Sequence, residues 1–411
     1  MNIKSLLLGS AAALVAVTGA RAADVIVPVA PEPTDYVRVC DVYGSGFFYI
    51  PGTETCMKIG GYVRFKYIMQ DLDTIGGPFG DEDALNAAGD DYAAYSRVRV
   101  RLNFDVREET ELGTLRAFAR VQAENTTGQF GDAAYAMDQG YIQLGGLTMG
   151  YLDTLWTEGD GLLTDTDLPV GDIQVNRISY TYAADGFSAA LSLEDDATGD
   201  FAPNVVGRLA YEGGWGSVYL AGSYDEELLL SGSVYGPLII NGTFTEFLDG
   251  SEFTTDGGFA LKAGLSLKDL IATDSELKFE GSYAFDPSQY STIDLIDTGP
   301  FAFTVPSEWQ VGAGYAQAFG KLGIAVSGIY GRTFDLDTGS LTTPPYLSLG
   351  GSGDYYKLVG NVGYEITNNF DVLAEISYAN VDFDDADQAD LYLGDDSVNQ
   401  TAGFIQFVRS F

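Results

Sequence analysis

Histidine is absent from this 411-residue sequence, and cysteine occurs only twice. A Ser-His-Asp triad or a Cys-His dyad therefore has no base available, and most zinc sites lose their usual nitrogen ligand. Basic residues are also scarce, with 21 Lys and Arg against 59 Asp and Glu. Because phosphate binding depends on clustered Lys and Arg, we expect no nucleic-acid partner. We predict a protein that is not an enzyme and holds no cofactor and no metal centre.

Long apolar runs are missing apart from a short one at the N-terminus. Residues 1–22 combine Lys4, an apolar stretch from Leu6 to Val17 and the small-x-small motif ARA at 20–22. This order is typical of a secretory signal peptide. The alternative, a membrane-anchoring helix, needs a longer apolar stretch. The exported chain is therefore periplasmic, secreted or an outer-membrane barrel.

Residues 23–57 are expected to form an extended linker followed by a disulfide-closed segment. The stretch VIVPVAPEPTDY carries three prolines, which favour an extended chain. Cys40 and Cys56 are the only cysteines, and a pair in an exported protein is most simply a disulfide. A free, redox-active pair is the alternative, but CxxC spacing is absent.

The remainder, 58–411, is rich in Gly, Tyr and Phe and alternates between polar and apolar residues with period two. Short and long joints alternate between segments of about ten residues, as periplasmic turns and extracellular loops do in a transmembrane barrel. The expected strands are 58–69, 95–107, 114–124, 138–145, 147–154, 176–184, 187–195, 204–212, 215–224, 259–270, 276–286, 308–319, 322–334, 354–366, 370–383 and 398–411. This pattern predicts an all-β, up-and-down, antiparallel transmembrane β-barrel of about sixteen strands. A soluble exported β-protein such as an adhesin stays open as the alternative.

Cations gather on one face of the first three expected strands. When Lys4 and Arg21 are subtracted from 21, 19 Lys and Arg remain, and we assign eight of them to a ladder on this face. They are Lys58, Arg64, Lys66, Arg97, Arg99, Arg101, Arg116 and Arg120. An Arg or Lys at the lipid midplane costs about 2–4 kcal/mol, so a barrel must turn this ladder inward. In a soluble sheet the same face would simply be solvated.

Several segments together resemble the general porin family of alphaproteobacterial outer membranes. They are MNIKSLLLGSAAALVA at the start, YVRVCDVYGSGFFYIPGTETCMKIGGYVRF at 36–65, ETELGT at 109–114, YIQLGGLTMG at 141–150 and the final FVRSF. The resemblance implies an outer-membrane barrel, usually a homotrimer, that passes small hydrophilic solutes and ions by passive diffusion. It also implies that the third loop folds inward and narrows the lumen.

The third loop, 155–175, therefore supplies the expected acidic pole opposite the basic ladder. Its acids are Glu158, Asp160, Asp165, Asp167 and Asp172. Opposed charges would create a transverse field that orients dipolar solutes, although ordinary solvated loop acids are the alternative. We expect selectivity to shift toward cations when Arg97, Arg99 and Arg101 become serine.

Three further expectations concern specificity and partners. A substrate-specific channel of the same fold would show rows of lumenal aromatics, and the inward Phe118 and Tyr62 are too few to make one. The acidic clusters 81–83, 90–91, 195–196, 225–227 and 382–390 are either solvated loops or sites where divalent cations bridge to lipopolysaccharide. The resemblance further implies that Phe411, the aromatic last residue, is recognised by the barrel-assembly machinery.

Overall fold

The computed structural model describes residues 38–73, 92–127, 133–196, 199, 201–230, 239–240, 243–244, 253–297, 302–335, 352–384 and 397–411. The expected signal peptide, the linker up to residue 37, and the acidic clusters at 81–83, 90–91 and 385–390 lie outside these residues. Residues 1–39 and 40–411 form two separate units, and the second contains everything discussed below. Within the described residues, no helix is long and apolar enough to cross a membrane.

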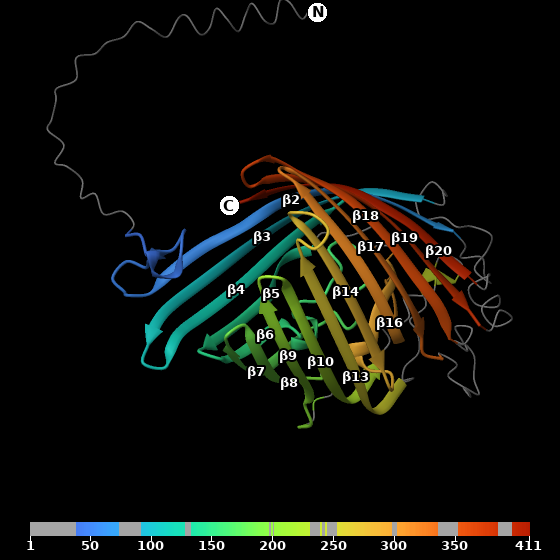
Figure 1. Ribbon diagram of the computed structural model, residues 1–411, viewed down its shortest axis with the longest axis horizontal. Coiled ribbons are helices and arrows are strands. Elements are labelled where there is room, and N and C mark those ends of the chain that lie inside the picture. Colours follow the sequence, from blue (N-terminus) through green and yellow to red (C-terminus); the bar gives the residue numbers. More distant parts are fainter. Residues whose placement is uncertain are drawn as a thin grey trace, which may run out of the picture. The chain divides into compact units, whose positions relative to one another are not determined.

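Sixteen long strands in the described part of 40–411 form one antiparallel sheet that closes into a barrel (Figure 1). They are β2 (Cys56–Asp73), β3 (Tyr92–Thr110), β4 (Gly113–Thr126), β5 (Ala133–Leu144), β6 (Leu147–Asp153), β7 (Gln174–Ala184), β8 (Phe187–Glu194), β9 (Asn204–Gly213), β10 (Gly216–Leu230), β13 (Phe253–Lys268), β14 (Ser275–Ala284), β16 (Ala302–Phe319), β17 (Leu322–Thr333), β18 (Gly353–Thr367), β19 (Phe370–Phe383) and β20 (Ser397–Ser410). Each pairs with its neighbour in the sequence. The predicted fold class and strand number are confirmed.

The barrel closes where β20 pairs with β2, from Tyr62 opposite Ser410 to Asp73 opposite Asn399. Phe411 extends this seam, because its backbone N–H and C=O both bond to Gly61, at 3.0 and 3.1 Å. A chain that ends on a strand therefore leaves no free sheet edge here.

The disulfide-closed segment continues the sheet beyond the end of β20. The short strand β1 (Phe48–Tyr49) pairs with Cys56 and Met57 of β2, on a stretch that β20 no longer covers. The predicted disulfide between Cys40 and Cys56 is confirmed, and the 3-10 helix η1 (Asp41–Tyr43) lies within the loop that it closes. Because short turns face the periplasm in such barrels, this segment belongs to the periplasmic end.

The two faces of the sheet follow the alternation in the sequence. On β2, Val63, Phe65 and Tyr67 are 44, 43 and 40% exposed on the outer face, while Arg64 and Lys66 point inward. Apolar side chains outside and charges inside are the arrangement that a lipid bilayer requires.

Several strands extend further toward the long loops than their sequence indicated. β10 continues to Leu230, β13 already begins at Phe253 and β16 at Ala302. The expected loop 287–307 contains the 3-10 helix η3 (Gln289–Ser291) and strand β15 (Thr292–Asp297), which pairs with β16. Two further short strands, β11 (Ile239–Ile240) and β12 (Thr243–Phe244), pair with each other. The expected joint 225–258 is thus partly strand.

Candidate functional site

The loop between β6 and β7 lies inside the barrel, where its residues pack against side chains of the inner wall. It begins with the 3-10 helix η2 (Leu155–Thr157), whose cap Thr154 accepts a hydrogen bond from the Trp156 N–H. Five apolar side chains of this loop are at most 3% exposed: Leu155, Trp156, Leu162, Leu168 and Val170. They form clusters with residues of β9, β10, β13, β14, β16 and β17. Since these partners face the lumen, burial of the apolar side chains holds the loop against the inner wall.

The base of the third loop is fixed by a buried carboxylate, Glu194, at the end of β8. Glu194 is fully buried and accepts hydrogen bonds from the Thr154 hydroxyl at 2.6 Å and the Leu155 N–H at 3.0 Å. The Tyr290 hydroxyl adds a third at 3.1 Å, and Arg177 lies 4.0 Å away. A buried charge with this many partners is stable only in one arrangement of the loop.

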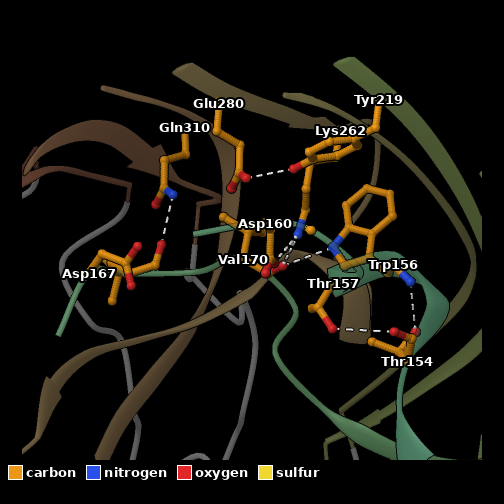
Figure 2. Close-up of polar contacts among 12 residues, drawn as sticks. Thr154, Trp156, Thr157, Asp160, Asp167, Val170, Tyr219, Lys262, Glu280 and Gln310 are labelled. Carbon is orange, nitrogen blue, oxygen red and sulfur yellow. Dashed lines mark hydrogen bonds and ion pairs between the residues drawn. The ribbon is translucent and has the colours of Figure 1, made fainter. Parts of the chain in front are cut away.

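The middle of the third loop is fixed to the wall by two lysines, of which Lys262 is labelled in Figure 2. The Lys262 ammonium, 1% exposed, donates to the Asp160 carboxylate at 3.0 Å and to the Val170 carbonyl at 2.8 Å. It also lies 4.8 Å from the Trp156 ring. Lys278 donates to the backbone carbonyls of Gly159 and Asp160. Neither lysine was predicted, although Lys262 alternates with the apolar residues of β13 just as the ladder does on β2 and β3.

A second inward segment supports the third loop. Tyr290 is fully buried, with its ring 5.9 Å from that of Trp156, and Ile293 and Leu295 of β15 are at most 2% exposed. The Gly171 N–H donates to the Thr292 carbonyl at 2.7 Å. Gly171 has φ 69°, and a Cβ there would lie 2.7 Å from the Tyr290 carbonyl. Two loops therefore pack against each other inside the barrel, of which the sequence indicated one.

All eight predicted cations lie on the lumenal face, but they do not form one group. Lys66, Arg64 and Tyr62 of β2 stand opposite Arg97, Arg99 and Arg101 of β3. Lys58 lies at the periplasmic end, where its side chain approaches Gly46 and the Phe47 ring of the disulfide-closed segment. Lys58 is thus separated from the part of the ladder that lies beside the third loop.

Wall carboxylates neutralise much of the ladder. Glu124 of β4 forms ion pairs with both Arg97 and Arg99, and Asp138 of β5 pairs with Arg101 and Arg120. Arg116 pairs with Asp105 at 3.0 Å. Asp138 sits at a register shift between β4 and β5, so strict alternation could not reveal it.

The five loop acids have different surroundings. Among the described ion pairs, the only one that joins a loop acid to the ladder is that between Asp165 and the Lys66 ammonium, which lie 3.0 Å apart. Asp160 pairs with Lys262 instead, and Asp167 accepts a hydrogen bond from the Leu162 N–H within the loop. Glu158 and Asp172 are exposed to the lumen.

Asp165 lies between two lumenal cavities. A cavity of about 560 Å³ includes Lys66, Arg97 and the loop residues 165–169 in its lining, and another of about 720 Å³ includes 163–165 and the turn residues Asp269 and Asp274. Asp165 lines both, and its backbone N–H donates to Glu375 of β19 at 2.8 Å. Asp165 therefore separates two parts of the lumen.

Burial shifts the acidity of one loop carboxyl. Loss of hydration raises the pKa of Asp167 from its ordinary value of 3.8 to about 6, with nearby Glu280 and Asp160 adding to the shift and the Leu162 N–H opposing it. In the described residues, no group of three or more acids and cysteines is arranged to hold a metal ion.

The closed barrel, its apolar outer face and its charged lumen define a channel protein of the bacterial outer membrane. The porin subfamily matches residues 24–403, and this chain belongs to that family. Porin Omp2b of Brucella canis and of Brucella abortus are each 39% identical over 279 residues, which are 61% of this chain and 74% of the Brucella protein. The chain is an outer-membrane porin and not an enzyme, and the soluble adhesin is not favoured.

Solved structures share the fold at low sequence identity. The outer-membrane channel DcaP of Acinetobacter baumannii matches with a TM-score of 0.56 and 15% identity, over 88% of this chain and 99% of DcaP. The trimer form of OmpT from Vibrio cholerae matches with a TM-score of 0.51 and 12% identity, over 87% of this chain and 100% of OmpT.

Proposed function

We propose that the channel passes small hydrophilic solutes and ions by diffusion through a constriction between the third loop and the β2–β3 ladder. The observation that carries this proposal is the position of Asp165 between two cavities, 3.0 Å from Lys66. Lys66 and Arg97 line one of these cavities together with Asp165 and the exposed acid Asp172. Opposite charges across a narrow, low-dielectric passage orient dipolar solutes and disfavour apolar ones.

Thiol labelling tests whether Asp165 lies in the current path. The native cysteines are joined in a disulfide, so Asp165→Cys introduces one free thiol into the described structure. Reaction with a bulky anionic thiol reagent is expected to lower single-channel conductance by roughly half or more, because conductance depends on the narrowest section.

Glu108→Cys is the matched control, since Glu108 is an exposed acid at the periplasmic end of β3. Its modification is expected to change conductance by about a tenth or less. Equal effects at both positions would contradict a constriction at Asp165.

Selectivity is expected to depend on pH through Asp167. The pKa of about 6 lies above the ordinary value of 3.8, so the loop loses a negative charge as pH falls through 6. Cation-over-anion permeability, measured from reversal potentials in a KCl gradient, is therefore expected to fall between about pH 7.5 and about pH 5.

Asp167→Asn is expected to remove the step near pH 6, whereas Asp165→Asn removes a charge but keeps the step. A step of the same size in Asp167→Asn would assign the titration to another group.

Export and assembly complete the proposal. Residues 1–22 act as a signal peptide, 23–57 form the linker and disulfide-closed segment, and 58–411 form the barrel. Three such barrels form a homotrimer, as the trimer form of OmpT does. Phe411 is recognised by the barrel-assembly machinery, and the acidic clusters that lie outside the described residues, 81–83, 90–91 and 385–390, are bridged by divalent cations to lipopolysaccharide. Chemical crosslinking in outer membranes tests the trimer directly.

A further inference from the structure

We propose that the periplasmic mouth of the channel contains a binding site for planar organic anions, such as aromatic carboxylates. The site, called the mouth cluster below, combines two oriented guanidiniums with aromatic rings from the wall and from the disulfide-closed segment. It consists of Tyr43, Phe47, Asp105, Arg107, Arg116, Phe118 and Tyr141. The proposal rests on the proposed diffusion function in one respect, which is that small anions must enter the lumen.

Asp105 orients both arginines of the mouth cluster. Arg107 donates to its carboxylate through Nε at 2.9 Å and Nη2 at 2.7 Å, and Arg116 does so through Nε and Nη2 at 3.0 Å each. Among the described residues, neither Nη1 group donates to a protein acceptor. One carboxylate between two guanidiniums leaves one positive charge uncompensated, and guanidinium edges bind a carboxylate well.

Aromatic rings flank the two guanidiniums. Arg116 lies 5.1 Å from the Phe118 ring and 5.4 Å from the Tyr141 ring, and these two rings stack with centroids 5.1 Å apart. Arg107 lies 5.1 Å from the Phe47 ring and 5.8 Å from the Tyr43 ring. Cations over ring faces at these distances attract further π-systems into the same stack.

The mouth cluster faces the lumen. Asp105 and Arg107 lie on the inward face of β3. Phe118 of β4 pairs with Asp105 of β3 on one side and with Tyr141 of β5 on the other. Side chains of Arg107 and Arg116 keep 28 and 23% of their surface exposed. Glu109, at the end of β3 on the same inward face, accepts a hydrogen bond from the Thr114 hydroxyl at 2.8 Å and is hydrogen-bonded to Tyr43 of the mouth cluster. Lys58 offsets this acid by adding a cation 6.0 Å from the Phe47 ring.

The disulfide gives one wall of this site its position. Phe47 is 5% exposed and packs with Cys40 and Cys56, while the Cys40 N–H donates to the Phe47 carbonyl at 2.9 Å. The disulfide-closed segment thus brings Phe47 and Tyr43 over Arg107. A planar anion fits this arrangement better than a saturated one of equal charge, because only the planar ring stacks on guanidiniums and aromatic faces.

Block of the chloride current by benzoate, cyclohexanecarboxylate and acetate in planar bilayers tests the proposal with the full-length channel. The first two probes share charge and similar size, and only benzoate has an aromatic face. Benzoate is expected to block at a concentration several-fold lower than cyclohexanecarboxylate, and acetate to block least. Phe118→Leu is expected to abolish the difference between benzoate and cyclohexanecarboxylate.

Phe279→Leu is the matched control, because Phe279 of β14 is 44% exposed on the outer face, and it should retain the preference for benzoate. Replacing Cys40 and Cys56 together by serine should reduce the preference by releasing Phe47. Equal block by the two ring carboxylates in the native channel overturns the proposal, as does a preference that survives Phe118→Leu. Neither result affects the constriction at Asp165, which the thiol block measures separately.

Discussion

Replacing Arg97, Arg99 and Arg101 together by serine is expected to increase cation-over-anion permeability by roughly tenfold, a change of about 1.4 kcal/mol. The effect is large because it has two parts. Three positive charges leave the lumen, and Glu124 loses both of its ion-pair partners. Asp138 keeps Arg120 but loses Arg101. The reversal potential in a KCl gradient measures the shift, and single-channel conductance is expected to rise as side-chain volume is removed.

Two controls separate the ladder from general charge effects. Adding Glu124→Gln to the triple variant should return part of the selectivity, because the exposed carboxylate is then neutral. Arg332→Ser removes a cation that pairs with Asp354 at 2.9 Å at the loop end of β17, and it should have little effect because charges beyond about 8 Å are screened at physiological salt. An unchanged reversal potential in the triple variant would remove the ladder from the current path.

Gly61→Ala is expected to prevent most of the protein from closing into a barrel. A Cβ at this position would lie 2.1 Å from the Arg101 carbonyl oxygen, which is backbone of the paired strand β3. The clash cannot be relieved by a side-chain rotation, and overpacking of this kind costs about 1–3 kcal/mol or more. The folded fraction, measured as the heat-modifiable band on detergent gels, is expected to fall by roughly tenfold.

Gly207→Ala is the matched control, because it is the same change in a barrel strand, β9, where nothing lies within 4 Å of the new Cβ. It should fold normally.

Deleting Phe411 removes both backbone bonds to Gly61, whereas Phe411→Ala keeps them and removes only the ring. If the deletion variant does not fold, the backbone of Phe411 is needed to close the barrel. If Phe411→Ala refolds from denaturant but is not assembled in cells, the Phe411 ring is needed for recognition by the assembly machinery. Normal folding of Gly61→Ala would show that the seam tolerates a shift of β3.

Strand number and facing were predictable because both depend on local pattern. Alternation along β2 and β3 placed Arg64 and Arg99 inside, and a bilayer permits only that choice. Strand ends were less predictable: β13 begins at Phe253 because pairing with β10 continues through the polar residues 254–256, which read as a loop in the sequence.

The charge environment of the ladder could not be predicted in the same way. Glu124 and Asp138 neutralise its arginines only because the β3–β4 and β4–β5 registers bring them together, including the shift beside Arg120. Lys262 was missed for a different reason. Its inward position follows from alternation, but its pairing with Asp160 depends on where a loop 102 residues earlier in the sequence lies.

By itself, the sequence determined a sixteen-stranded barrel with a basic lumenal face, a disulfide and a terminal strand that closes the seam. The barrel and its facing follow from period-two alternation, turn composition and the cost of charge in lipid, and the disulfide follows from the presence of only two cysteines. Only the tertiary structure decided that a second loop enters the lumen beside the third, that Glu194 and Lys262 fix the third loop, and that aromatic rings surround Asp105 at the mouth. Those features depend on contacts between residues far apart in the chain, which the barrel creates only when it closes.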